Sequence, residues 1–193
     1  MNMNMRIHKI VNSVFASNTY VLSEETSRNC WLIDIGDIKP IIDFVKNRVI
    51  KGVFITHSHY DHIYGIRQLI ELYPDCLIYT NEEGRIGMAS DKFNFSRYHG
   101  DPISFTHRNI TVLNNGETVE LYPGCLMKAT YTPGHDRSCL TYYTDEYVFS
   151  GDSYIPGFEV VTTFPRSNKE DSSESLKKIY QLLETRKIKP GHQ

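Results

Sequence analysis

The sequence lacks the features that define several large classes of protein. It has no run near the ~20 consecutive apolar residues of a membrane-spanning helix, and its N-terminus shows no apolar signal-peptide core. The four cysteines form no Cys-x-x-Cys pair, which favours reduced thiols over a disulfide framework. A formal net charge of −2 lacks the basic excess of an obligate nucleic-acid binder. We therefore expect a cytoplasmic protein with a small-molecule substrate and no nucleic-acid or membrane partner; a homo-oligomer stays open.

Internal repeats, low-complexity segments and linker-like stretches are also missing. The chain has 193 residues, of which 40% are hydrophobic, and this length is enough to bury a sizeable core without disulfides. We therefore predict a single domain over residues 1–193.

Apolar patterning predicts strands that alternate with helices, which implies an α/β class with sheets covered by helices on their outer faces. The predicted strands lie within residues 6–36, 49–56, 76–80, 110–122, 126–132 and 140–150. The predicted helices cover residues 41–48, a segment from Ile63 that ends near Pro74, and a last segment that starts near Asp171 and ends before Pro190. Asp171 and Glu174 form the predicted capping box of this last helix. Residues 81–108 are predicted to be irregular, with a long loop from Asp91 to Asp101.

The strongest motif is Thr56-His57-Ser58-His59-Tyr60-Asp61-His62, where a predicted buried strand meets a helix. His57 and His59 alternate, so in an extended segment their side chains leave the same face and can share one ion. Asp61 and His62 come at the turn into the helix and can point to an adjacent position. Imidazole and carboxylate groups without a thiolate suit zinc, iron or manganese. Chance would produce this spacing in roughly one of 1,000 chains of this composition, so we predict a metal site rather than a polar loop.

Three later segments each place a candidate ligand where a predicted element ends. His135 follows a strand in Thr-Pro-Gly-His, Asp152 follows a strand in Ser-Gly-Asp, and His192 follows the last helix in Lys-Pro-Gly-His. Each segment alone is a weak signal, because such residues are more often ordinary turn or surface residues. Their joint occurrence in this order extends the metal hypothesis to seven side chains.

These residues resemble the ligand set of the metallo-β-lactamase-fold hydrolases, and the pattern is most similar to the glyoxalase II branch. The flanking segments Asn18 to Leu22 and Ile33 to Asp37 agree, so the resemblance spans residues 18–192. It implies a four-layer αββα sandwich, in which two mixed sheets are covered by helices and the metals lie at one edge of the sheets.

The resemblance also implies which side chain binds which ion. The first metal would be bound by His57, His59 and His135. The second would be bound by Asp61, His62 and His192. Asp152 would bridge both, and Asp61 and Asp152 are the predicted catalytic residues. The best-known class of true β-lactamases has a cysteine at the Asp152 position and no histidine at the His62 position, so this chain looks unlike a dedicated β-lactamase.

Seven ligands exceed the needs of one tetrahedral zinc ion, so we expect two divalent metal ions, with Zn²⁺ favoured and iron or manganese as alternatives. A metal pair ~3.5–4 Å apart can hold a hydroxide, because metal binding lowers the pKa of water from about 15.7 towards ~7. This hydroxide would attack the carbonyl carbon of an ester or thioester, as the resemblance to hydroxyacylglutathione hydrolases implies. The sequence has no Gly-x-Ser-x-Gly elbow that would indicate a serine nucleophile instead.

Other activities of the same fold stay open. A persulfide dioxygenase-type oxygenase would use one iron, for which His57, His135 and Asp152 are enough; the presence of all seven residues favours hydrolysis. A lactonase or phosphodiesterase would use the same metal pair, since fold does not fix substrate. The net charge disfavours a nuclease, and a metal-binding scaffold without turnover has no support because no ligand is missing.

Recognition of the substrate is expected from loops such as Asp91 to Asp101, or from another subunit, because only one residue follows His192. In that loop the residues Phe93, Phe95 and Tyr98 can form a lid, although anchoring the loop to the core is favoured.

Several further side chains carry weaker predictions. Asp136 can orient a histidine or be a plain surface carboxylate, and Tyr60 can line the cleft or pack in the core. Arg137 is more often a solvated loop residue than an anion contact. Asp34 and Asp37 are assigned to a structural turn. No metal role is given to His8, His99 and His107.

Overall fold

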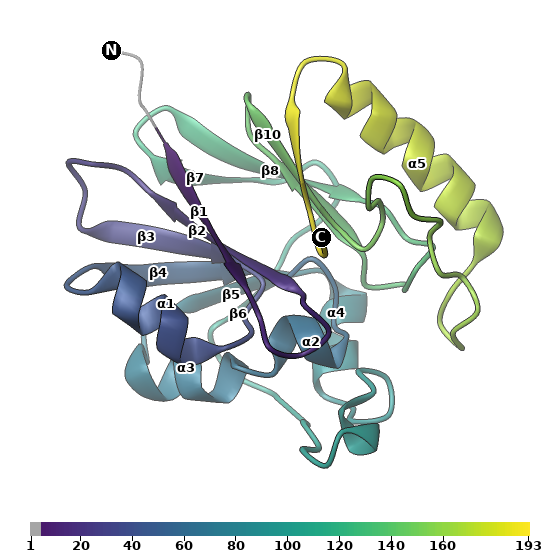
Figure 1. Ribbon diagram of the computed structural model, residues 1–193, viewed down its shortest axis with the longest axis horizontal. Helices are drawn as coiled ribbons and strands as arrows, with labels where there is room; N and C mark the ends of the chain where they lie inside the picture. Colours follow the sequence, from purple (N-terminus) through teal and green to yellow (C-terminus); the bar gives the residue numbers. More distant parts are fainter. Residues whose placement is uncertain (1–4) are drawn as a thin grey trace.

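The computed structural model describes residues 5–193 (Figure 1). Its first sheet has the strand order β1-β2-β3-β4-β5-β6. The strands are β1 (Arg6–Val11), β2 (Asn18–Ser23), β3 (Asn29–Ile33), β4 (Val49–Phe54), β5 (Leu77–Thr80) and β6 (Ile110–Val112). The pairs from β1 to β3 are antiparallel and the pairs from β3 to β6 are parallel, so this sheet is mixed.

The second sheet has the strand order β11-β10-β9-β8-β7. Its strands are β7 (Thr118–Tyr122), β8 (Cys125–Tyr131), β9 (Leu140–Tyr143), β10 (Tyr147–Gly151) and β11 (Lys187–Pro190). Strands β7 to β10 pair antiparallel, whereas β11 pairs parallel to β10. The second sheet is therefore also mixed.

Helices cover the outer faces of both sheets (Figure 1). The first sheet is accompanied by α1 (Ile38–Val45), α2 (Tyr60–Ile63), α3 (Ile66–Leu72) and α4 (Glu82–Met88). The second sheet is accompanied by α5 (Lys169–Leu183). A short 3₁₀ turn, η1 (Ser96–Tyr98), lies in the loop between α4 and β6. This arrangement confirms the predicted αββα sandwich of two mixed sheets.

Two apolar clusters hold the layers together, one on each face of the first sheet. Along β3 the side chain of Leu32 packs towards the helices, while Trp31 and Ile33 pack towards the second sheet. This alternation is what a strand buried on both faces requires. Between the sheets, Phe54 stacks on Tyr79 with ring centroids 4.7 Å apart and meets Tyr142 edge-on at 5.2 Å. Phe54 is the last residue of β4, so these rings pack at the strand end from which the chain continues into the histidine motif.

The structure corrects the prediction for residues 81–108, because α4 forms at the start of this stretch. The sequence signal was masked by Gly84 and Gly87, which weaken helix propensity. A Cβ at Gly87 would overlap the Ser58 side chain, so the glycine lets α4 pack closely against the histidine motif.

Three other details also differ from the sequence-based expectation. The predicted strand region 110–122 divides into β6 and β7, which belong to different sheets. The last helix is capped by Asn168, whose side chain accepts from the Asp171 amide at 2.9 Å, and not by a box of Asp171 and Glu174. Residues Lys187–Pro190 form β11, so His192 follows a strand rather than a bare turn.

No helix among the described residues has the length and apolar character needed to cross a membrane. The prediction about the N-terminus falls in part on residues 1–4, which lie outside the described residues. All four cysteines are free thiols, and burial raises the pKa values of Cys30 and Cys76 to about 12.

Candidate metal centre

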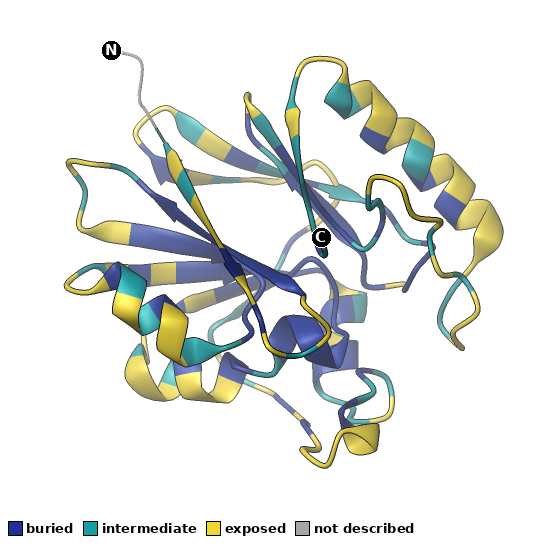
Figure 2. Ribbon diagram, in the orientation of Figure 1, coloured by how far each residue is buried: buried dark blue, intermediate teal, exposed yellow. Residues whose placement is uncertain are grey.

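Strand ends from both sheets bring the candidate ligands to one edge of the sandwich. β4 ends at Phe54, and the chain then runs through the histidine motif into α2. His135 follows β8, Asp152 follows β10, and His192 follows β11. Figure 2 shows this region and α2 as buried, although the segments reach it from opposite sheets. A cluster of polar side chains therefore lies between the two sheets.

Glycines allow the backbone segments that carry the candidate ligands to approach each other closely. Gly151 adopts a left-handed φ of 51°, and a Cβ there would overlap the Thr56 side chain. A Cβ at Gly191 would overlap Asp152 Oδ1 and crowd the His62 ring. The glycines of the Ser-Gly-Asp and Pro-Gly-His segments are thus required by the approach of the two sheets rather than by turn formation alone.

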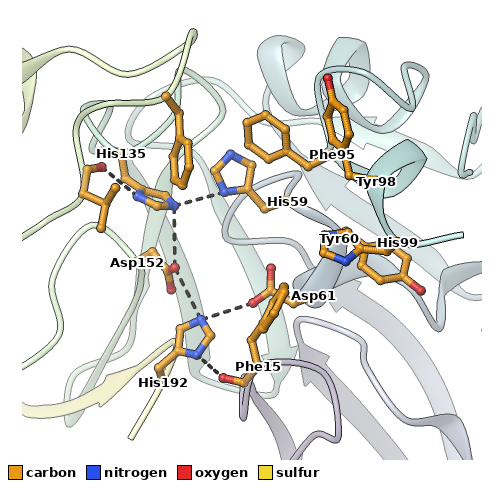
Figure 3. A pocket seen from close by; sticks show the side chains of 12 residues that line it. Phe15, His59, Tyr60, Asp61, Phe95, Tyr98, His99, His135, Asp152 and His192 are labelled. Atoms are coloured by element: carbon orange, nitrogen blue, oxygen red, sulfur yellow. Dashed lines mark hydrogen bonds and ion pairs between the residues drawn. The ribbon is translucent and has the colours of Figure 1, made fainter. Parts of the chain in front are cut away.

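All seven side chains singled out from the sequence lie in this cluster. Their ligand atoms fall into three overlapping groups, each within 4.8 Å: His57, His59 and His135; His57, His62 and Asp152; and Asp61, His62 and His192. Asp152 lies between the groups (Figure 3). Its Oδ2 lies 3.6 Å from His135 Nε2 and 3.4 Å from His192 Nε2, and its Oδ1 lies 3.4 Å from His62 Nε2.

The outer hydrogen bonds of four histidines fix their tautomers. Acceptors hold the Nδ1–H of each ring: Thr56 Oγ1 for His57, Asp34 Oδ2 for His62, Val161 O for His135, and Phe15 O for His192. Each Nε2 is therefore the ring nitrogen that faces the cluster, where it can bind a metal ion when it carries no proton. The His59 ring has the opposite orientation, because its Nδ1 rather than its Nε2 faces His135 and lies 3.0 Å from His135 Nε2.

This donor set fits divalent metal ions. The Nε2 of His57 is fully buried and has no hydrogen-bond partner, which is costly unless a cation satisfies it. The facing nitrogens of His59 and His135, and of His62 and His192 at 3.3 Å, can satisfy each other only through a proton or a metal. Imidazole and carboxylate donors suit zinc, iron and manganese alike, so the donor set does not select one metal.

The cluster has two halves with opposite electrostatic character. The first half contains His57, His59 and His135, and the second half contains Asp61, His62 and His192. Burial lowers the pKa values of His57 and His135, and neighbouring imidazoles lower them further, so both rings are neutral at pH 7. Burial also opposes protonation of His62, but the carboxylates of Asp61, Asp152 and Asp34 outweigh it and raise its pKa well above the usual value. A cation at this second half must therefore displace protons.

The carboxylates are ionised in this environment. Burial alone would raise the pKa values of Asp61 and Asp152, but the nearby imidazoles of His62 and His192 outweigh it and lower both. For His192, burial is likewise outweighed by Asp152 and Asp61, which raise its pKa to about 9.

A pocket of about 460 Å³ opens onto one side of the cluster (Figure 3). Its lining contains five of the candidate ligands together with aromatic side chains from four segments. Tyr60, Phe95 and Tyr98 line this pocket, so these three side chains face the cleft. Phe93 instead packs under the Arg166 guanidinium at 4.9 Å, and Arg137 is exposed outside the lining. The sequence did not indicate Phe15 or Phe164, which also line the pocket.

A model of the metallo-beta-lactamase superfamily matches residues 14–192 of this chain. The chain belongs to the metallo-β-lactamase superfamily.

Solved structures of similar shape agree with this assignment at the level of the fold. The BLEG-1 B3 metallo-beta-lactamase is 21% identical, with a TM-score of 0.85 over 97% of this chain and 92% of its own. TTHA1623, solved in a di-iron-bound form, is 22% identical, with a TM-score of 0.80 over 96% and 92%. ETHE1 from Myxococcus xanthus is 22% identical, with a TM-score of 0.78 over 98% and 76%.

In this metallo-β-lactamase superfamily protein, Asp34 has a larger part than the structural turn predicted for it. It is buried in a left-handed conformation, with φ of 56°. Its carboxylate accepts from the Thr56 amide and hydroxyl at 2.7 Å and from His62 Nδ1 at 2.8 Å. The same residue therefore fixes the end of β4 and orients a candidate ligand. Asp37, in contrast, accepts from Ser13 and Tyr64 and contacts no ligand.

Asp136 is buried and lies beside His59, which favours the orienting role over the surface role. Its Oδ2 is 3.7 Å from His59 Nε2, and Arg166 Nε donates to it at 3.0 Å. Burial opposes ionisation of Asp136, but His59 and Ser138 outweigh it and lower its pKa. Arg166 also contacts Glu83 of α4 at 3.0 Å, so it links α4 to the cluster through Asp136.

We expect Asp34→Asn to weaken metal binding in the second half of the cluster by about 10- to 100-fold, because an amide cannot replace both oxygen acceptors. Binding at the first half should change less, since His59 and His135 do not contact Asp34. Metal titration of the metal-free protein by calorimetry measures both affinities. Asp37→Asn is the matched control from the same turn, and equal losses in the two variants would contradict the role of Asp34.

Proposed function

We propose that this protein is a dinuclear metal-dependent hydrolase of carbonyl esters or thioesters. One observation carries the proposal: seven histidine and aspartate side chains converge in one cluster, and five of them line a pocket. Three or four ligands satisfy one tetrahedral ion, so seven support two ions. When bound, such ions supply a hydroxide-type nucleophile at neutral pH and polarise a carbonyl group.

The side chains divide the work between them. His57, His59 and His135 would hold the first ion. Asp61, His62 and His192 would hold the second. Asp152 faces ligands of both groups, so its carboxylate would help to hold both ions.

In the proposed reaction, the oxygen of water bonds to the carbonyl carbon, the bond to sulfur or oxygen breaks, and the thiol or alcohol leaves with a proton. Asp61 and Asp152 keep the cluster charge low and position the histidines, and no serine or cysteine nucleophile is needed. Cys139, the cysteine nearest to a candidate ligand in the sequence, is buried with a raised pKa and is therefore unreactive.

The purified protein is expected to contain close to two metal ions and to hydrolyse a thioester or ester in a chelator-sensitive manner. Asp61→Ala should reduce turnover by about 10²-fold or more, because His62 and His192 lose their shared carboxylate. Metal analysis by plasma emission spectroscopy and a thioester, lactone and phosphodiester panel provide the measurements. Full activity in Asp61→Ala would refute the dinuclear hydrolase.

An iron-dependent oxygenase of the persulfide dioxygenase type is the second candidate, because His57, His135 and Asp152 alone can hold one iron. It predicts oxygen uptake with glutathione persulfide by the iron-loaded protein and no hydrolysis of any substrate in the panel. This result would replace the hydrolase proposal.

A further inference from the structure

The wall of the pocket beside the candidate ligands is built almost wholly from aromatic rings. We call the rings of Phe15, Tyr60, Phe95, Tyr98 and Phe164 the aromatic wall. Phe95 lies with its centroid 4.8 Å from His59 and 5.2 Å from Phe164, and Phe164 lies 5.5 Å from His135. The wall therefore begins at the imidazoles of two candidate ligands, His59 and His135 (Figure 3).

The other side of the pocket continues the same surface. Tyr60 stacks on His99 with centroids 4.9 Å apart, and Phe15 meets His99 edge-on at 5.3 Å. Phe15 is 64% exposed and Tyr98 is 69% exposed, so large apolar rings face water at the mouth. A ligand that covers these rings removes apolar surface from water, which favours an apolar or flat group.

The wall provides no partner for a negatively charged substrate. In the described part of the chain, the lining residues of this pocket include no lysine or arginine. Two arginines near the wall are already paired, Arg97 with Asp91 at 2.7 Å and Arg166 with Asp136 and Glu83 at 3.0 Å, and the exposed Arg137 lies outside the lining. A substrate carboxylate lying along the wall would lose hydration without gaining an ion pair, which is unfavourable.

We propose that the substrate is an uncharged ester or thioester whose acyl group is apolar and flat, such as an arylacyl group, and that the aromatic wall binds this group. The inference rests on the proposed hydrolytic function and adds its substrate class. It implies weak activity on anionic substrates, which include glutathione thioesters and other esters with a carboxylate near the reacting bond.

Matched thioesters test the charge preference. The metal-loaded protein is assayed with phenylacetyl thioesters of N-acetylcysteamine and of 3-mercaptopropionate, which share the acyl group but differ in the charge of the thiol. We expect kcat/KM to be about 10- to 100-fold higher for the uncharged thioester, the effect of an unpaired charged group at a desolvated site. A succinyl thioester of N-acetylcysteamine tests the same preference on the acyl side.

Variants test the wall itself. Phe164→Ala should lower kcat/KM for the phenylacetyl thioester about 5- to 30-fold and leave the acetyl thioester less affected, because a phenyl ring has more apolar surface to bury against Phe164 than a methyl group has. Phe158→Ala is the matched control, since Phe158 is 65% exposed, lies in the same segment and does not line this pocket. Tyr98→Arg should raise activity on the anionic thioester by placing a cation in the wall.

A binding measurement separates recognition from turnover. A phenylacetyl ketone in which CH₂ replaces the sulfur cannot be cleaved, and calorimetry should show weaker binding to Phe164→Ala than to Phe158→Ala. Equal or better turnover of anionic thioesters would overturn the inference while leaving the hydrolase intact. No turnover of any ester or thioester by the metal-loaded protein would instead refute the proposed function.

Discussion

Asp152→Ala is expected to lower kcat by about 10³-fold and to reduce the bound metal from about two ions to one or fewer. The Asp152 carboxylate lies within 4 Å of four imidazoles, those of His57, His62, His135 and His192. No other carboxylate faces both halves of the cluster in the described residues, because Asp61 contacts only His62 and His192. The loss should therefore affect both sites at once.

Two controls separate this effect from a general loss of folding. Asp152→Asn keeps the shape of the side chain but removes its charge, and it should lose most of the activity while retaining the fold. Asp145→Ala removes a carboxylate whose side chain is 88% exposed, and it should leave activity and metal content unchanged. Turnover, metal content and Tm of the three variants give the comparison. Asp152→Ala with two bound metals and near-normal kcat would exclude Asp152 as the bridge.

The sequence predicts the candidate ligands, but it does not predict the residues that surround and support them. His57, His59, Asp61 and His62 come from one short segment, where strand alternation and the turn into a helix determine which way the side chains point. His135, Asp152 and His192 were found because each ends a predictable element after a glycine. Their meeting point depends on how two sheets pack, which the sequence pattern indicated only through the resemblance to a family.

The supporting residues were missed for a different reason. Phe15, Phe164 and Arg166 are ordinary residue types in irregular segments, and only the tertiary fold brings them to the cluster. Asp34 was predicted to stabilise a turn, and it does accept from Thr56, but its second acceptor function at His62 needs a partner 28 residues away. Helix α4 was missed because its glycines serve close packing against Ser58 at the expense of helix propensity.

Removal of the metal ions is expected to lower Tm by about 8–16 °C at pH 7.5, because ligand at about 1,000 times Kd stabilises the folded state by ~4 kcal/mol and 1 kcal/mol corresponds to about 2–4 °C in a chain of this size. Without metal, the cluster relies on ion pairs between Asp61, Asp152, His62 and His192. Thermal unfolding with and without a chelator measures the difference, and equal Tm values would refute a structural contribution from bound metal.

The difference in Tm between the metal-loaded and the metal-free protein should depend on pH, in a direction that follows from the pKa shifts of the histidines. The folded-state pKa of His192 is raised to about 9, so its ion pairs stabilise the metal-free protein fully below the unfolded value of about 6.5 and are lost as the pH rises through 9. His57 and His135 have lowered pKa values and destabilise the folded state only below about pH 6.5. Between pH 6.5 and 9 the metal-free protein should therefore lose stability.

The metal-loaded protein should show the opposite trend over the same range, because histidines must be neutral to bind metal and metal binding strengthens as protons leave. The gap in Tm between the two forms should thus widen from pH 6.5 to pH 9. His192→Gln is the discriminating variant, since it removes one of the two histidines with a raised pKa and should reduce the pH dependence of the metal-free protein, with His62 contributing the rest. A gap that narrows with rising pH would mean that protons and metal ions do not compete for this cluster.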